Sequence, residues 1–253
     1  MSVVHFVGAG PGAADLLTLR GKALLEGADV VVYAGSLVNP ALLAYTKPSC
    51  AIRNSAEMTL EEVLAVMKTA IGEGKMVVRL HTGDPSLYGA IREQMDALAA
   101  MGIEYSICPG VSSFCAAAAA LRVEYTLPDV SQTVIITRAA GRTPVPEGEN
   151  LQALAAHGAT MVLFLSMSLV ESVSADLIAG GYAPDTPAAI VYKASWPEEQ
   201  ILRCTVKTLA QTARAVGIRK TALICIGRFL SNDYALSRLY AADFSTEFRE
   251  AKP

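Results

Sequence analysis

Three short loops that combine glycine with hydroxyl or carboxylate side chains hold the residues best suited to bind a small ligand. They span residues 8–13 (GAGPGA), 82–85 (TGDP) and 109–113 (PGVSS), and each follows an apolar run. Glycine lets the backbone approach a ligand closely. The carboxylate of Asp84 can accept hydrogen bonds from a ribose or an ammonium group, and the serines of the third loop add hydroxyls.

The first loop formally fits the GxGxxG/A pattern of dinucleotide-binding proteins. Two features argue against that interpretation. Pro11 lacks the backbone N–H that a phosphate cradle needs. The acidic residue expected at the end of the second strand is missing, because Asp29 begins that strand. A tight turn between strand and helix remains the alternative.

The other two loops also have structural interpretations. Asp84 followed by Pro85 could simply begin a helix, as N-cap and first helical residue. Ser112 or Ser113 could cap the alanine-rich segment that follows. The occurrence of three such loops, each after a strand, favours a shared binding site.

The first half of the chain alternates short apolar runs with helical patterns, which predicts a parallel sheet covered on both faces. Ligands bind such sheets beyond the carboxyl ends of the strands, where the three loops fall. The predicted strands span residues 3–7, 30–33, 76–81 and 104–107, and the predicted helices span 16–26, 59–72, 90–100 and 114–121.

The alternation of strand and helix patterns stops at residues 122–129. We interpret this segment as a linker between a domain of residues 1–125 and a domain of residues 126–253. Two adjacent predicted strands in the second half, 188–192 and 200–206, imply antiparallel pairing and hence a mixed sheet. The other predicted strands there span 133–137, 160–165 and 222–226. The predicted fold class is α/β, with two α/β domains.

Composition excludes several classes of protein. The chain has 253 residues, of which 52% are hydrophobic and 18% charged, and its formal net charge of −3 disfavours nucleic acid as a partner. Apolar runs are too short to span a membrane, and the first residues do not resemble a signal peptide. Five cysteines without a CxxC pair and three scattered histidines predict no metal site. We therefore expect a cytoplasmic protein.

Four motifs in order resemble the tetrapyrrole methylases: VHFVGAGPGAADLLTLRGKALLEGADVVVYAGSLV, RLHTGDPSLYGA, PGVSS and FLSM. The resemblance extends over residues 4–227 and implies two α/β domains with the active-site cleft between them. It also implies S-adenosyl-L-methionine as methyl donor, S-adenosyl-L-homocysteine as product, and a homodimer. Where the family has GGDP, this chain has TGDP.

The resemblance also assigns residues to the donor site. Met167 could instead be a core residue and Thr221 a strand residue. The donor-binding residues implied by the resemblance are Pro11, Thr82, Gly83, Asp84, Leu87, Ser112, Ser113, Met167, Ala194 and Thr221.

Within the family, YAGSLVN and VYKASWPEEQILRCTV resemble the members that methylate precorrin-4, or cobalt-precorrin-4, at ring carbon C-11. Methylation of uroporphyrinogen III or another precorrin is the alternative. An NAD-linked oxidoreductase and a non-catalytic binding protein are remoter ones. Whether the substrate already carries cobalt is left open.

Methyl transfer from a sulfonium to an electron-rich carbon needs neither metal nor covalent nucleophile, so no catalytic base is assigned. A tetrapyrrole with many carboxylates needs local positive charge. Arg138 and Arg142 are the candidates for binding it, because arginine pairs well with carboxylates. The alternative is that both are solvated loop cations.

Overall fold

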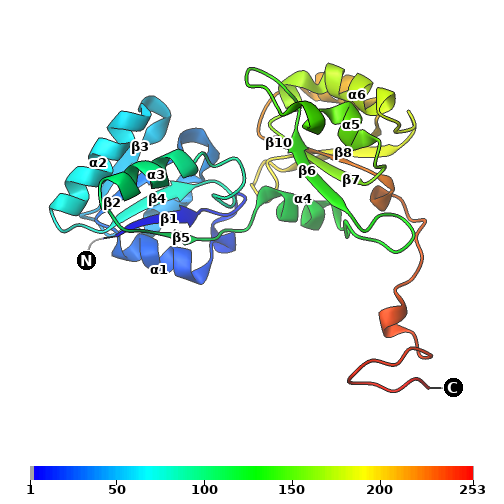
Figure 1. The fold of residues 1–253 in the computed structure, drawn as a ribbon, viewed down its shortest axis with the longest axis horizontal. Helices are drawn as coiled ribbons and strands as arrows, with labels where there is room; N and C mark the ends of the chain where they lie inside the picture. Colours follow the sequence, from blue (N-terminus) through cyan, green and yellow to red (C-terminus); the bar gives the residue numbers. More distant parts are fainter. Residues whose placement is uncertain (1–2, 253) are drawn as a thin grey trace. The chain divides into compact units, whose positions relative to one another are not determined.

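Two five-stranded sheets form the framework of the computed structural model, which describes residues 3–252 (Figure 1). By their internal packing the residues divide into two units. The first comprises Met1–Ala117 with Lys193–Glu199, and the second comprises Ala118–Tyr192 with Gln200–Pro253.

The first unit contains a wholly parallel sheet in the order β3-β2-β4-β1-β5. The sequence predicted four of these strands and missed β3. The strands are β1 (Val4–Gly8), β2 (Val30–Tyr33), β3 (Ala51–Asn54), β4 (Val77–His81) and β5 (Tyr105–Cys108).

Helices cover both faces of this sheet, as the near-continuous apolar strands require. Along β1, Phe6 packs in the cluster that includes α2 and α3, whereas Val7 packs in the cluster that includes α1. The helices are α1 (Leu19–Gly27), α2 (Leu60–Gly72) and α3 (Arg92–Ala100), with the 3-10 helices Ala14–Leu16, Gly35–Leu37, Pro40–Tyr45 and Ser55–Glu57.

Capping side chains set where these helices begin. The Thr18 hydroxyl accepts a hydrogen bond from the Gly21 N–H, so α1 begins at Leu19, later than predicted. At α2, Thr59 and Glu62 form a reciprocal capping box.

The second unit contains a mixed sheet in the order β6-β7-β10-β8-β9, in which β6 and β7 pair in parallel and the other pairs are antiparallel. The predicted fold class is confirmed. The strands are β6 (Val134–Arg138), β7 (Thr160–Phe164), β8 (Pro187–Tyr192), β9 (Gln200–Thr205) and β10 (Ala222–Ile226).

Helices α5 (Leu151–Ala155), α6 (Val170–Ala179) and α7 (Leu209–Val216) pack on this sheet around a core that includes Leu163, Leu177 and Ile190. The 3-10 helices of the unit are Glu147–Glu149, Met167–Leu169, Arg228–Leu230 and Arg238–Tyr240.

The division between the units differs from the predicted domain boundary after residue 125. It falls within α4 (Ser113–Leu121), because the chain passes from one unit to the next as continuous helix. In addition, Lys193–Glu199, which connects β8 to β9, packs with the first unit. A single boundary in the sequence cannot describe this arrangement, because the loop belongs to the first unit while the strands on either side of it belong to the second.

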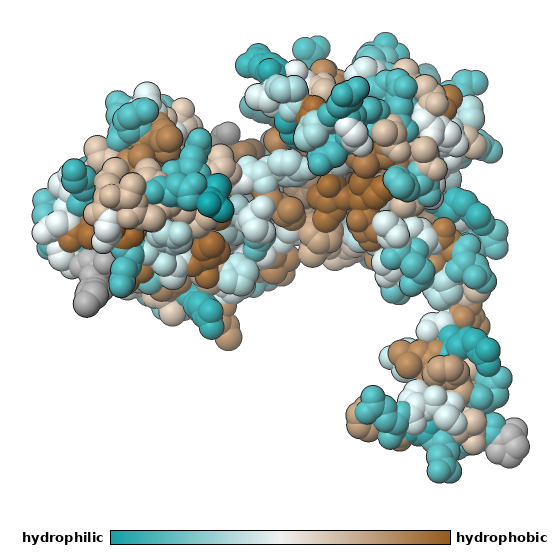
Figure 2. All heavy atoms as spheres, viewed as in Figure 1, coloured by the Kyte–Doolittle hydropathy of each residue, from teal (hydrophilic) through white to brown (hydrophobic). Residues whose placement is uncertain are grey.

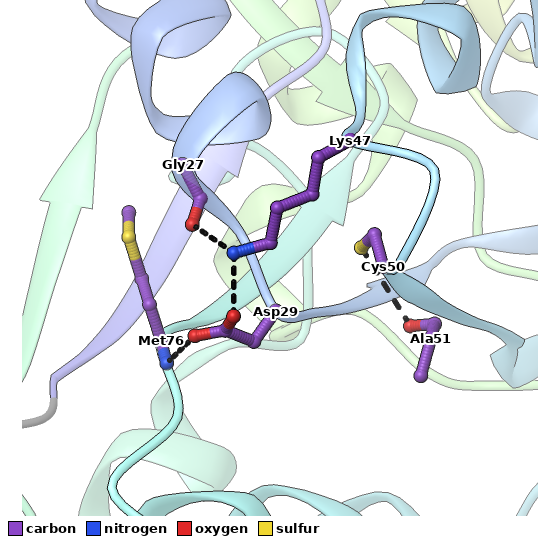
Figure 3. A network of polar contacts seen from close by, with 6 residues as sticks. All are labelled: Gly27, Asp29, Lys47, Cys50, Ala51 and Met76. Atoms are coloured by element: carbon purple, nitrogen blue, oxygen red, sulfur yellow. Dashed lines mark hydrogen bonds and ion pairs between the residues drawn. The ribbon is translucent and has the colours of Figure 1, made fainter.

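At the amino ends of the first unit's strands, Asp29 anchors a polar network (Figure 3). Its carboxylate pairs with Lys47 Nζ at 2.5 Å and accepts a hydrogen bond from the Met76 N–H at 2.8 Å. These bonds hold the pKa of Asp29 below its ordinary value. The network therefore ties strand ends opposite to those that carry the glycine loops.

Among residues 3–252, none of the helices is long and apolar enough to cross a membrane. The residues after Asn232 contain a local network in which the Arg249 guanidinium donates to the carbonyls of Leu239, Ala241 and Phe244. Leu236 and Tyr240 there are exposed. Figure 2 shows brown, hydrophobic atoms among the teal, hydrophilic atoms of this segment.

Candidate active site

The three glycine loops meet at the carboxyl ends of β1, β4 and β5. The first two loops pair directly: the Gly10 N–H donates to the Gly83 carbonyl at 3.2 Å, and the Gly83 N–H donates to the Gly10 carbonyl at 2.8 Å. Because the strands are parallel neighbours, loops far apart in sequence are joined at one edge of the sheet.

The loops can lie in contact because glycine, which has no side chain, occupies the positions where their backbones meet. A Cβ on Gly110 would lie 2.2 Å from the Gly83 carbonyl oxygen and 2.7 Å from Gly8 Cα. A Cβ on Gly8 would lie 2.6 Å from Gly110 Cα. These backbones could not approach so closely if either residue carried a side chain.

Asp84 connects the second loop to the third. Its Oδ2 accepts from the Gly110 N–H at 2.9 Å, and its Oδ1 accepts from the Ser86 N–H at 2.9 Å and from the Ser86 hydroxyl. Partial burial alone would raise the pKa of Asp84. The hydrogen bonds from Ser86 and Gly110 outweigh burial and hold the pKa below its ordinary value. Asp84 is therefore a carboxylate at neutral pH.

The helix-cap interpretation of Asp84 does not describe what it does. Residues 85–88 form a turn, and α3 begins only at Arg92. Asp84 holds that turn through Ser86.

Ser112 and Ser113 lie beside the second loop at the start of α4. A Cβ on Gly83 would lie 3.6 Å from Ser113 N and 3.7 Å from Ser112 Cα. Ser112 is buried, and its carbonyl accepts from the Cys115 N–H at 3.0 Å, within the first turn of α4. The start of α4 and the end of the third glycine loop thus coincide here.

The backbone of the first loop is already bonded within the protein. The Ala9 N–H donates to the His81 carbonyl at 2.7 Å, Gly10 pairs with Gly83, and the Ala13 N–H donates to Ser195 Oγ at 3.0 Å. Pro11 has no N–H. A pyrophosphate cradle would need these donors, and Asp29 is engaged at the opposite strand ends, so the loop is not built as a dinucleotide site.

Most of the residues that the family resemblance assigns to the donor site lie in the first unit, in or near the three glycine loops. Thr82 and Leu87 are half-buried in the second loop, where the Leu87 N–H donates to the Asp84 carbonyl at 3.2 Å. Pro11, in the first loop, is buried, and so is Ala194, which belongs to the segment Lys193–Glu199.

The two remaining donor-site candidates lie in the second unit. Met167 begins a 3-10 helix after β7 and is buried in the unit's core cluster. Thr221 directly precedes β10 with a φ of 57°, a left-handed conformation unusual for a β-branched residue. Their binding roles stay predictions.

Arg138 and Arg142, the candidates for the substrate carboxylates, differ in their surroundings. The Arg138 guanidinium donates to the carbonyls of Thr143 and Pro144 at 3.1 and 2.7 Å, and so holds its own loop in shape. Arg142 is exposed within that loop. Their roles toward a substrate also stay predictions.

Reasoning from residue types did not single out Trp196, Ser195 and Asn39, all of which bond to the first loop. One feature of the sequence could have indicated the role of Trp196. Trp196 is the chain's single tryptophan, and it lies in a polar loop between two strands, where burial in a core is not expected.

Comparison with known proteins decides the family. Residues 3–210 match the model of the tetrapyrrole (corrin/porphyrin) methylases. This chain belongs to that family. The tetrapyrrole methylase described here is 55% identical over 249 residues to a cobalt-precorrin-4 C(11)-methyltransferase of Methanocaldococcus jannaschii, covering 98% of this chain and 96% of the relative. The predicted family is confirmed.

Solved structures confirm the fold of this tetrapyrrole methylase. An X-ray structure of a cobalt-precorrin-4 methyltransferase, a cobalamin biosynthetic enzyme, matches with a TM-score of 0.88 and 52% identity, covering 90% of this chain and 95% of that one. A uroporphyrin-III C-methyltransferase of Thermus thermophilus, complexed with S-adenosyl homocysteine, matches with a TM-score of 0.77 and 26% identity, covering 90% and 99%.

Proposed function

We propose that this tetrapyrrole methylase transfers the methyl group of S-adenosyl-L-methionine to ring carbon C-11 of precorrin-4 or cobalt-precorrin-4. The observation that carries the proposal is the 55% identity, over 98% of the chain, to a cobalt-precorrin-4 C(11)-methyltransferase. The Thermus thermophilus uroporphyrin-III enzyme is 26% identical and a uroporphyrinogen-III C-methyltransferase of Bacillus subtilis is 32% identical, which favours precorrin-4 over uroporphyrinogen III.

The first unit has groups that suit this donor. S-adenosyl-L-methionine presents an ammonium group and ribose hydroxyls, which need acceptors. Each oxygen of Asp84 already accepts protein hydrogen bonds, yet carboxylate oxygens carry further acceptor capacity. Ser112 and Ser113, whose backbone lies near Gly83, contribute hydroxyls, and the glycines at 8 and 110 keep side chains out of the backbone contacts between the loops.

When bound, the donor supplies a methyl group on a positively charged sulfur, which departs as a neutral thioether after in-line attack by the ring carbon. The protein's contribution is then chiefly orientation. Holding two reactants in line is worth up to about 7–11 kcal/mol in favourable cases. The loops suit this task because the Asp84 carboxylate accepts from the Gly110 N–H, while the Gly83 backbone pairs with that of Gly10.

The substrate's carboxylates need cations, and Arg142 is our first candidate. Its side chain is exposed on the loop that Arg138 shapes through the Thr143 and Pro144 carbonyls. In this proposal Arg142 binds a carboxylate directly and Arg138 presents the loop. Arginine favours such paired contacts.

We further propose that the enzyme works as a homodimer, as its family resemblance implies, and in the cytoplasm, as its sequence composition predicts. Analytical ultracentrifugation tests the first point: a single species of monomer mass at micromolar concentration contradicts it.

Equilibrium dialysis tests the class of donor, and incubation tests the acceptor. We expect saturable binding of S-adenosyl-L-methionine and none of NAD. With the donor present, precorrin-4 or cobalt-precorrin-4 should gain one methyl by mass, and uroporphyrinogen III should gain none. Binding of NAD alone, or methylation of uroporphyrinogen III alone, would overturn the proposal.

A further inference from the structure

Residues Lys193–Glu199 form a self-bonded turn between β8 and β9, which we call the clasp. The Trp196 N–H donates to the Lys193 carbonyl at 2.9 Å, and the Ser195 N–H donates to Glu199 Oε2 at 2.7 Å. Lys193 and Ser195 have φ values of 46° and 68°. Left-handed conformations are costly for residues with side chains, and these local bonds help to maintain them.

The clasp bonds to the first glycine loop at two points. Trp196 Nε1–H donates to the Pro11 carbonyl at 2.9 Å, and Ser195 Oγ accepts from the Ala13 N–H at 3.0 Å. The indole also occupies the place of a side chain on Gly12, where a Cβ would lie 2.0 Å from Trp196 Cδ1. Loop and clasp are therefore complementary in shape as well as in hydrogen bonding.

These bonds complete the fixing of the first loop. On one side, Gly10 pairs with Gly83 of the second loop. At the other side, clasp side chains bond the Pro11 carbonyl and the Ala13 N–H, while the Ala13 carbonyl accepts from the Leu16 N–H at 3.2 Å. Asn39 adds a third support, donating from Nδ2 to the Gly12 carbonyl at 2.8 Å.

We propose that Trp196 and Ser195 are positioning residues that hold the first glycine loop in the conformation that binds the methyl donor. Donor binding by the first unit therefore requires the clasp, which connects two strands of the second unit. This inference rests on the proposed function, because it takes the glycine loops as the donor site.

Trp196→Phe tests the role directly, since it keeps an aromatic ring over Gly12 and removes the N–H bonded to Pro11. We expect the Kd for S-adenosyl-L-homocysteine and the KM for the donor to rise about tenfold, while the KM for the tetrapyrrole and kcat change little. Tyr182→Phe is the matched control. It removes an aromatic donor to the Ala159 carbonyl in the second unit and should leave donor affinity unchanged.

Ser195→Ala provides a second variant that disturbs packing less. Its matched control is Ser131→Ala, because Ser131 Oγ accepts from the Thr160 N–H at 3.0 Å in the second unit, as Ser195 Oγ does from Ala13 in the first. Ser195→Ala should weaken donor binding more than Ser131→Ala at equal thermal stability. Equal donor affinity in both, with Trp196→Phe also unchanged, would overturn the inference.

The wild-type protein supplies a further readout because Trp196 is its only tryptophan. Donor titration should change tryptophan emission with the same Kd that dialysis gives, whereas NAD should not. If the wild type binds no donor at all, the proposed function itself fails, which is a different result from normal binding by the variants.

Discussion

The backbone N–H of Gly110 donates a hydrogen bond to Asp84 Oδ2 at 2.9 Å, so two loops separated by a complete helix are joined by one carboxylate. The bond requires glycine at 110, because any Cβ there would meet the Gly83 carbonyl. Its acceptor is an ionised acid, because the bonds from Ser86 and Gly110 hold the pKa of Asp84 below its ordinary value against partial burial.

Asp84→Asn should weaken donor binding with little loss of fold. The amide has only one accepting oxygen, so its NH2 must face either the Gly110 or the Ser86 N–H. Loss of a charge-assisted bond costs about 1.5–3 kcal/mol, or at least tenfold in affinity. Calorimetric titration with S-adenosyl-L-homocysteine checks this. Asp185→Asn, at an exposed site in the second unit, is the control, and equal affinity in both variants would refute the role of Asp84.

Gly110→Ala should destabilise the first unit and abolish donor binding, because its Cβ would lie 2.2 Å from a backbone carbonyl oxygen that cannot turn away. Overpacking of this kind costs about 1–3 kcal/mol or more. Gly72→Ala is the contrasting variant: Gly72 ends α2, its Cβ position has no atom within 4 Å apart from its chain neighbours and the backbone of α2 itself, and the variant should gain up to about 1 kcal/mol. Urea unfolding measures both. Similar stabilities for the two variants would contradict the packing of the loops.

His81, the last residue of β4, should make stability depend on pH. Its side chain is buried against Phe6, and burial, followed by the nearby Arg79 charge, lowers its pKa from 6.5 to about 3. The unfolded chain therefore binds a proton below pH 6.5 that the folded chain does not. Stability falls as the pH drops from 6.5 toward 3, by about 2 kcal/mol at pH 5.

His81→Phe should remove that loss while keeping a ring beside Phe6. Urea unfolding at pH 7 and pH 5 should show a smaller difference in this variant than in the wild type. His157→Phe, at an exposed position, should retain the wild-type difference. The same pH dependence in all three proteins would show that His81 is protonated in the folded state.

Arg142→Ala should raise the KM for the tetrapyrrole at low salt by about fivefold, the value of roughly 1 kcal/mol for one exposed charge contact. The effect should shrink at high salt, where screening weakens exposed charges. Arg219→Ala, another exposed arginine of the second unit, is the control. Unchanged affinity at low salt would remove Arg142 from the substrate site.

Periodic apolar patterns predicted the elements that position the site. The bounds of β2, residues 30–33, agree with prediction because three buried valines precede Tyr33. By contrast, β3 escaped prediction: Ala51–Asn54 is a short edge strand whose only large apolar residue, Ile52, is exposed. Edge strands with exposed residues carry no clear period.

Contacts between distant loops could not be predicted from residue types. Asp84 bonds locally to Ser86, as an acid in a turn commonly does, yet its bond to Gly110 depends on how β4 and β5 flank β1. Trp196 reaches Pro11 across 185 residues of sequence. In the sequence Arg138 is a candidate to bind a carboxylate, but in the fold its guanidinium donates hydrogen bonds to carbonyls of its own loop.

Locating the transferred methyl group tests the central claim most directly. The protein is incubated with precorrin-4, and separately with cobalt-precorrin-4, together with S-adenosyl-L-methionine labelled with carbon-13 in its methyl group. Carbon NMR of the products should show one labelled methyl, at C-11, from at least one of the two substrates. Label at another ring position, or no label from either substrate while uroporphyrinogen III becomes methylated, would contradict the assignment.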